Sequence, residues 1–119
     1  MAGKLTIEAG DDRIVALITC PNSDCAETIA SAILKKGMAA CVNLIPGITS
    51  VYRWEGEICR DSEYLLVVKT LISQRDSLLS LLKSLHPYEE PELIFLPIHS
   101  GSESYLAWLT KQIIAEKST

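Results

Sequence analysis

Residues 40–69 read ACVNLIPGITSVYRW, then EG, then EICRDSEYLLVVK, and this stretch decides the fold. It predicts a hairpin whose two arms are each about a dozen residues long, roughly twice the usual strand. Glu55-Gly56 is the expected turn, because glycine accepts the backbone angles of tight hairpins. Pro46-Gly47 interrupts the first arm. A turn there would give two short strands, but proline in sheets is confined to edges and bulges, which favours a bulge within one long strand.

The length of these arms also predicts assembly. At about 3.3 Å per residue each arm reaches roughly 40 Å, which is more than two short helices can cover. Uncovered strands expose unpaired backbone groups that tend to pair with another chain. We therefore expect an obligate assembly, with any binding site where chains meet. Tyr52 and Trp54, near the hairpin tip, are expected to be packing anchors between subunits.

The segments around the hairpin alternate between strand and helix. An apolar strand at 13–20 leads into a helix, where Asp24 and Glu27 have the spacing of a capping box. A second helix at 73–85, a strand at 92–98 and a final helix at 102–115 follow. The leucines expected to form the buried stripe of the second helix are Leu78, Leu82 and Leu85, and the final helix is expected to pack Tyr105, Trp108, Leu109 and Ile113.

This order is strand-helix-strand-strand-helix-strand plus a helix, which predicts an α+β, ferredoxin-like βαββαβ domain with an additional C-terminal helix. Residues 13–119 are expected to form this single domain. Residues 1–12 are expected to be a loose N-terminal tail.

Composition excludes several classes of protein. The net charge is −4 and the pI is about 5.1, which argues against a nucleic-acid partner. An RNA-recognition module shares the predicted topology, but its aromatic motif is missing here. No run approaches the roughly 18 apolar residues of a membrane span. The first residues lack a signal peptide, so we expect a cytoplasmic protein with reduced cysteines. None of the four cysteines forms a C-x-x-C pair, so a structural zinc site is not expected.

His86 is the leading candidate ligand for a metal ion, because imidazole is the commonest metal ligand and the neighbouring prolines would fix its direction. It could instead be a helix C-terminal residue that is hydrogen-bonded to carbonyls. Cys41 could ligate copper or zinc as a thiolate, or could simply be a buried small side chain. Glu89 could complete this metal site with a carboxylate ligand. The alternative is that Glu89 belongs to a solvated acidic loop and binds nothing. A divalent metal, copper or zinc, is the cofactor these residues would hold.

Three further residues are candidates for a ligand-binding cleft. Lys69 follows an apolar strand, and a lysine partly buried at an interface needs a partner or an anionic ligand. The alternative is an exposed strand end. Asn43 could bind a ligand or satisfy the backbone. Tyr88 lies beside Glu89 in the proline-bounded loop.

Motifs for catalysis are not found. The sequence has no Gly-rich phosphate loop and no Gly-x-Ser-x-Gly elbow. Cys41 with His86 could imitate a Cys-His pair, but no third orienting group is evident. We expect a protein that is not an enzyme.

Three stretches taken together resemble the CutA family of divalent-cation tolerance proteins. They are residues 40–47 with Tyr52-x-Trp54-x-Gly56, then Val68-Lys69-Thr70, then His86-Pro87-Tyr88-Glu89-x-Pro91-Glu92. The closing Tyr105-Leu106-x-Trp108-Leu109 is also similar, and the resemblance covers roughly residues 13–112.

The resemblance implies a tight homotrimer, close in shape to the PII signal proteins, with a role in tolerance of copper and other divalent metals. In some family members metal binding is attributed to a cysteine on the first strand and paired histidines before the proline. Ile18 and Leu85 stand at two of those positions here. The expected function is a cytoplasmic homotrimer that binds a metal or a small ligand at clefts between subunits. The alternative is a trimeric signalling or scaffold protein with incidental metal binding.

Overall fold

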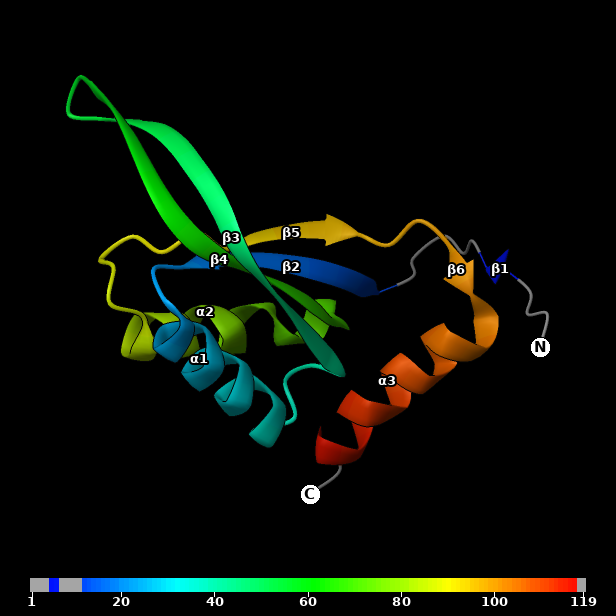
Figure 1. The fold of residues 1–119 in the computed structure, drawn as a ribbon. Helices are drawn as coiled ribbons and strands as arrows, with labels where there is room; N and C mark the ends of the chain where they lie inside the picture. Colours follow the sequence, from blue (N-terminus) through cyan, green and yellow to red (C-terminus); the bar gives the residue numbers. More distant parts are fainter. Residues whose placement is uncertain (1–4, 7–11, 118–119) are drawn as a thin grey trace.

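The computed structural model describes residues 5–6 and 12–117 of the chain (Figure 1). The expected loose tail, residues 1–12, lies mostly outside these residues. Its described part, Leu5–Thr6 (β1), pairs antiparallel with Gly101–Ser102 (β6). The remaining strands and helices are, in chain order, β2 (Arg13–Cys20), α1 (Ser23–Lys35), β3 (Cys41–Trp54), β4 (Glu57–Leu71), a 3-10 turn (Ile72–Gln74), α2 (Arg75–Leu85), β5 (Ile94–Pro97) and α3 (Glu103–Lys117).

Four strands form one antiparallel sheet in the order β3-β4-β2-β5. The α+β class and the order of elements expected from the sequence are confirmed. Strand β5 is shorter than the expected strand at 92–98, and α2 begins at Arg75, after a 3-10 turn, rather than at residue 73. Among the described helices, none is both long and apolar enough to cross a membrane.

The β3–β4 hairpin has the predicted length, turn and bulge. Its arms have 14 and 15 residues, and Figure 1 shows it projecting beyond the rest of the sheet. Glu55 and Gly56 both have positive φ, 49° and 83°, as a tight two-residue hairpin turn requires. The pairing register shifts between Ile45 and Ile48, and Gly47 has a φ of 73°. Pro46-Gly47 is therefore a bulge within one long strand.

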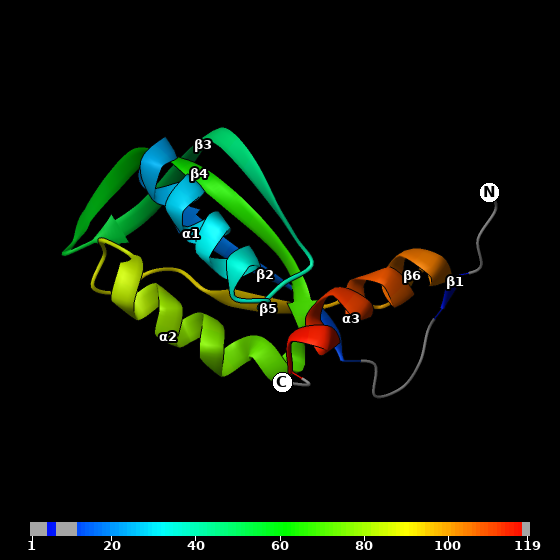
Figure 2. The same cartoon turned by 90° about the horizontal axis from the view of Figure 1, so that it is seen from below.

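Helices α1 and α2 pack side by side on one face of the sheet (Figures 1 and 2). Asn22 rather than Asp24 is the N-cap of α1, and its Oδ1 accepts a hydrogen bond from the Cys25 amide at 2.9 Å. The capping box expected at Asp24 and Glu27 is thus wrong, because the backbone is already helical at Ser23. In α2 the side chain of Leu81 is buried, whereas that of Leu85, at the last residue of the helix, is exposed.

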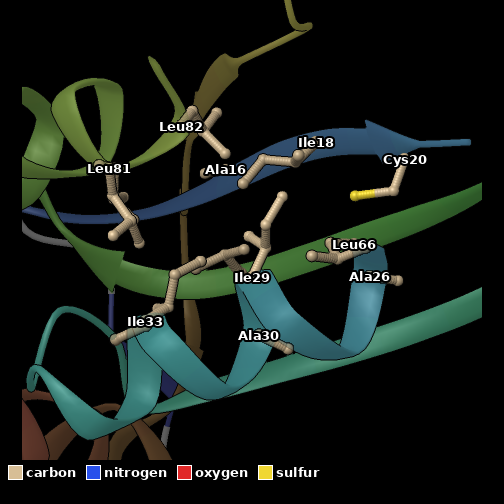
Figure 3. Close-up of a cluster of buried hydrophobic side chains, with 13 residues drawn as sticks. Ala16, Ile18, Cys20, Ala26, Ile29, Ala30, Ile33, Leu66, Leu81 and Leu82 are labelled. Atoms are coloured by element: carbon tan, nitrogen blue, oxygen red, sulfur yellow. The ribbon is translucent and has the colours of Figure 1, made fainter. Parts of the chain in front are cut away.

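The main core lies between this helical layer and the sheet (Figure 3). It is built from alternate residues of the strands, because successive side chains of a strand point to opposite faces. The fully buried strand residues on this face include Ala16, Ile18, Leu66 and Val68. They meet the inward stripes of the helices, which are formed by Ala26, Ile29, Ala30, Ile33, Leu78, Leu81 and Leu82.

The opposite face of the sheet is contacted at one end by α3, through a small cluster of Leu71 with Leu106, Leu109 and Ile113. Tyr105 and Trp108, expected to pack inward, are each 42% exposed, because α3 turns the Leu106 side toward the sheet. Beyond α3 this face carries partly exposed apolar side chains. We call it the open face, and its apolar members are Val15, Leu17, Ile45, Leu65, Val67, Ile94 and Leu96.

The hairpin turn gives a prediction about stability. A Cβ added at Gly56 would meet nothing within 4 Å, so a substitution there has only a backbone cost. We expect Gly56→Val to lower the free energy of unfolding by about 1–2 kcal/mol, because a β-branched residue is strained at positive φ. Gly56→Asn should lower the free energy of unfolding much less, because asparagine tolerates a positive φ. Denaturant unfolding at a fixed chain concentration measures both. Equal losses in the two variants would contradict the backbone explanation.

Candidate functional site

His86 lies where α2 ends and the proline loop begins. Its amide donates to the Leu82 carbonyl at 2.8 Å, and its own φ and ψ of −76° and 139° leave the helix, as expected before Pro87. The residue as a whole is only 8% exposed. Its Nε2 lies 2.8 Å from the Thr19 carbonyl oxygen, and its Nδ1 accepts from the Tyr88 amide at 3.1 Å. Because a carbonyl only accepts, Nε2 carries the proton, and the ring is a neutral imidazole with its lone pair at Nδ1.

Two cysteines lie beside this ring. Cys20 is the last residue of β2 and is fully buried (Figure 3), whereas Cys25, in the first turn of α1, is partly exposed. Their sulfur atoms and one ring nitrogen of His86 all lie within 4.8 Å of one another. Burial raises the pKa of the Cys20 thiol, and a hydrogen bond to Cys25 raises it further. Burial also raises the pKa of Cys25. Without a metal, both groups are therefore thiols at neutral pH.

A buried carboxyl group stands on the other side of the proline loop. Glu63, on β4, accepts from Ser50 Oγ at 2.7 Å and from the Tyr88 hydroxyl at 2.9 Å. Burial, followed by this bond to Glu63, raises the pKa of Tyr88. The Tyr88 ring also contacts the His86 ring, with centroids 4.8 Å apart. Tyr88, expected to line a ligand cleft, thus ties the proline loop to the base of the hairpin.

Three of the predicted residues meet at a corner of the open face. Cys41 pairs with Lys69 across β3 and β4, and Lys69 Nζ donates to Asn43 Oδ1. The same nitrogen lies 4.0 Å from Cys41 Sγ. Tyr105 of α3 borders this group, and its pKa is raised by burial and then by Cys41. The corner therefore offers one ammonium group, one amide and one thiol, and its charge is positive.

The predicted metal ligands His86, Glu89 and Cys41 do not gather within one chain. Cys41 pairs with Lys69, whereas Cys20 beside His86 pairs with Tyr64, five residues away along β4 and so roughly 16 Å distant. The two cysteines also point to opposite faces of the sheet. Glu89 is exposed on the proline loop. This ligand set stays a prediction that requires more than one chain.

The predicted assembly anchors lie on the projecting hairpin. Trp54 is 61% exposed next to the turn. The Tyr52 hydroxyl donates to an Asp61 carboxylate oxygen across the hairpin, and this bond is the main cause that raises the pKa of Tyr52 to about 12.

Sequence reasoning missed Cys25 and Glu63. Cys20 and Cys25 are five residues apart, and they approach only because a short turn at Pro21-Asn22 leads from β2 directly into α1. A strand-to-helix junction flanked by two cysteines is the signal that could have found them. Glu63 is the last residue of an ordinary polar segment, residues 60–63, and nothing local marks it as buried.

Comparisons with known proteins agree with this structure. The family model of the CutA1 divalent ion tolerance protein matches residues 14–112. The divalent-cation tolerance protein CutA of Thermus thermophilus is 50% identical over 95 residues, which cover 80% of this chain and 92% of that protein. The crystal structure of CutA1 from Oryza sativa aligns with a TM-score of 0.83 at 43% identity, covering 86% of this chain and 94% of that one.

A third comparison extends the match to nearly the whole fold. The structure of CutA from Synechococcus elongatus aligns with a TM-score of 0.85 at 35% identity, and the alignment covers 92% of this chain and 96% of that chain. With the family model spanning most of the sequence and relatives this similar, the chain belongs to the CutA1 divalent ion tolerance family.

Proposed function

We propose that this protein acts in divalent-cation tolerance as a cytoplasmic homotrimer of ferredoxin-like subunits. In this proposal a metal ion, copper among them, or a small ligand binds in clefts between the subunits. The role is binding rather than catalysis. The divalent-cation part follows from the family, and the assembly and the clefts rest on the features below.

The observation that carries the proposal is the open face. Seven apolar side chains lie there on one continuous sheet surface, and two of them, Ile94 and Leu96, are each 46% exposed on the edge strand β5. Apolar patches of this kind mark interaction surfaces, because leaving them in water costs free energy in proportion to their area. Further copies of this chain are the fitting partner, since the same chain also presents an unpaired edge at β3 and an apolar projecting hairpin.

The corner at Lys69 indicates where a cleft would form. Lys69, Asn43 and Cys41 lie on the same face as the apolar residues, so a subunit that covers the face also covers the corner. An ammonium group removed from water needs an anionic partner, and its hydrogen-bond acceptor Asn43 is a neutral amide. A small ligand with a carboxylate or similar group fits this position. A metal would instead use Cys41 with groups from another subunit.

The alternative is a trimeric signalling or scaffold protein, similar to PII proteins, in which metal binding is incidental. Two observations favour it. Both ring nitrogens of His86 already have hydrogen-bond partners, and His86, Glu89 and Cys41 are not gathered within one chain. The two proposals share the trimer and differ in whether assembly creates a metal site.

A charge on the open face tests the assembly. We expect the parent protein to scatter light as three times the 13.1 kDa chain mass. Leu96→Glu should dissociate it, because a carboxylate would be buried in the interface. Leu96 is already half-exposed in one chain, so the subunit itself should keep its fold. Thr28→Glu, on the outer side of α1, is the matched control and should stay trimeric. A monomeric or dimeric parent would overturn the trimer.

The same variants test the inter-subunit metal site. Copper affinity, measured by calorimetry, should fall at least about tenfold in Leu96→Glu but not in Thr28→Glu, because dissociation removes ligands contributed by the neighbouring chain. Circular dichroism confirms that the variant subunit is folded. Unchanged copper affinity after dissociation would locate the metal within a single chain and would overturn the inter-subunit metal site.

A further inference from the structure

A second candidate metal site lies on the helical face, away from the open face. Its potential ligands come from three different elements: Cys20 from the end of β2, Cys25 from the first turn of α1, and His86 from the end of α2. All three ligand atoms lie within 4.8 Å of one another. We propose that Cys20, Cys25 and His86 bind one thiophilic divalent ion, Zn(II) in type, within a single chain. This inference rests on the divalent-metal role proposed above but needs no subunit interface.

The geometry is close to that of a bound ion. Zn(II) lies about 2.3 Å from sulfur and about 2.0–2.1 Å from imidazole nitrogen, so tetrahedral ligands are separated by roughly 3.5–3.8 Å. The present separations of up to 4.8 Å need to shorten by about 1.3 Å at most. Cys25 can supply most of this movement, because it is partly exposed at the start of α1, whereas Cys20 is held in the core.

Charge and softness together select the class of ion. Two thiolates and a neutral imidazole around a divalent cation sum to zero, whereas a monovalent ion would leave a net negative charge. Neutrality matters because Cys20 is fully buried and His86 nearly so, and an uncompensated charge there would be costly. Thiolates favour zinc and similar ions over magnesium or calcium, which prefer oxygen ligands.

The surroundings of His86 also fit a metal ligand. A ligating histidine usually donates its other ring N–H to a carbonyl or carboxylate, which fixes the tautomer. Nε2 already does this with the Thr19 carbonyl, so the lone pair is at Nδ1. The Tyr88 amide occupies that lone pair at 3.1 Å, and an ion would replace it. The three residues leave the fourth position of a tetrahedral ion open to a further ligand such as water.

This ligand set differs from the one that the family resemblance implies. The first-strand cysteine of that pattern is Ile18 here, which is fully buried in the core, and the first histidine is Leu85, which is exposed at the end of α2. Of that pattern only His86 is retained. The two sulfur atoms come from residues outside it, Cys20 at the junction after β2 and Cys25 on α1.

Cobalt substitution tests the proposal, because Co(II) bound to thiolates gives a charge-transfer absorption that oxygen or nitrogen ligands do not give. The full chain is titrated with Co(II) under reducing, oxygen-free conditions, and the bound ion is then displaced with Zn(II). We expect one ion per chain with thiolate absorption. Cys25→Ser should weaken binding by roughly a hundredfold and reduce the absorption, as should His86→Gln. Cys59→Ser on the hairpin is the matched control and should bind like the parent.

Two results would overturn the inference: no thiolate absorption in the parent protein, or equal binding in Cys25→Ser and Cys59→Ser. Substitution of Cys25, which is only partly buried, avoids the core position of Cys20, and circular dichroism checks that each variant is folded. The dissociated Leu96→Glu variant separates this proposal from the inter-subunit cleft. If the site lies within one chain, the Leu96→Glu variant should still bind Co(II) through thiolates. This result does not depend on whether a metal also binds between subunits. Loss of the thiolate absorption on dissociation would contradict the single-chain site.

Discussion

The fold depends on one constraint, which is that a four-stranded sheet with apolar residues on both faces must have both faces covered. Helices α1 and α2 cover one face and form the main core with it. Helix α3 covers only the end of the other face, near Leu71. The rest of that face carries seven partly exposed apolar side chains, and in the proposed assembly other copies of the chain cover them, since exposed apolar area is unfavourable in water. The β3–β4 hairpin projects beyond the rest of the sheet and adds further exposed apolar side chains, among them Val51, Trp54 and Ile58.

Much of this architecture could be predicted because the decisive signals are local. The bulge at Pro46-Gly47 and the turn at Glu55-Gly56 follow from the backbone angles that proline and glycine allow, and both were found where expected. Helix ends were harder to predict. Asn22 and Asp24 are equally good capping residues by type, and only the geometry of the junction after β2 selects Asn22. In α3 apolar residues occur all round the helix, so periodicity could not choose Leu106 over Tyr105 for the buried side.

The candidate sites were also predictable to different degrees, depending on whether the signals that define them are local in the sequence. Lys69, Asn43 and Cys41 come together by simple strand pairing, and each was a candidate from its residue type and its place on one strand. The group around His86 is different, because it joins the end of a strand, the start of one helix and the end of another. Such a convergence depends on how the helices pack on the sheet, and no spacing within the sequence encodes it. Glu63 was missed because its partners, Ser50 and Tyr88, lie on other segments.

The two candidate regions differ in whether a single chain buries them. A second feature of the structure is that Tyr88 joins the proline loop to the hairpin. The corner at Lys69 would become enclosed only in the proposed assembly, whereas Cys20 and His86 are already buried within the single chain. Tyr88 donates through its amide to His86 and through its hydroxyl to Glu63, whose other oxygen accepts from Ser50 on the hairpin. An ion that takes the Nδ1 lone pair must release the Tyr88 amide. The same residue holds the base of the hairpin through Glu63, so Tyr88 links the site within the chain to the element that projects from the sheet.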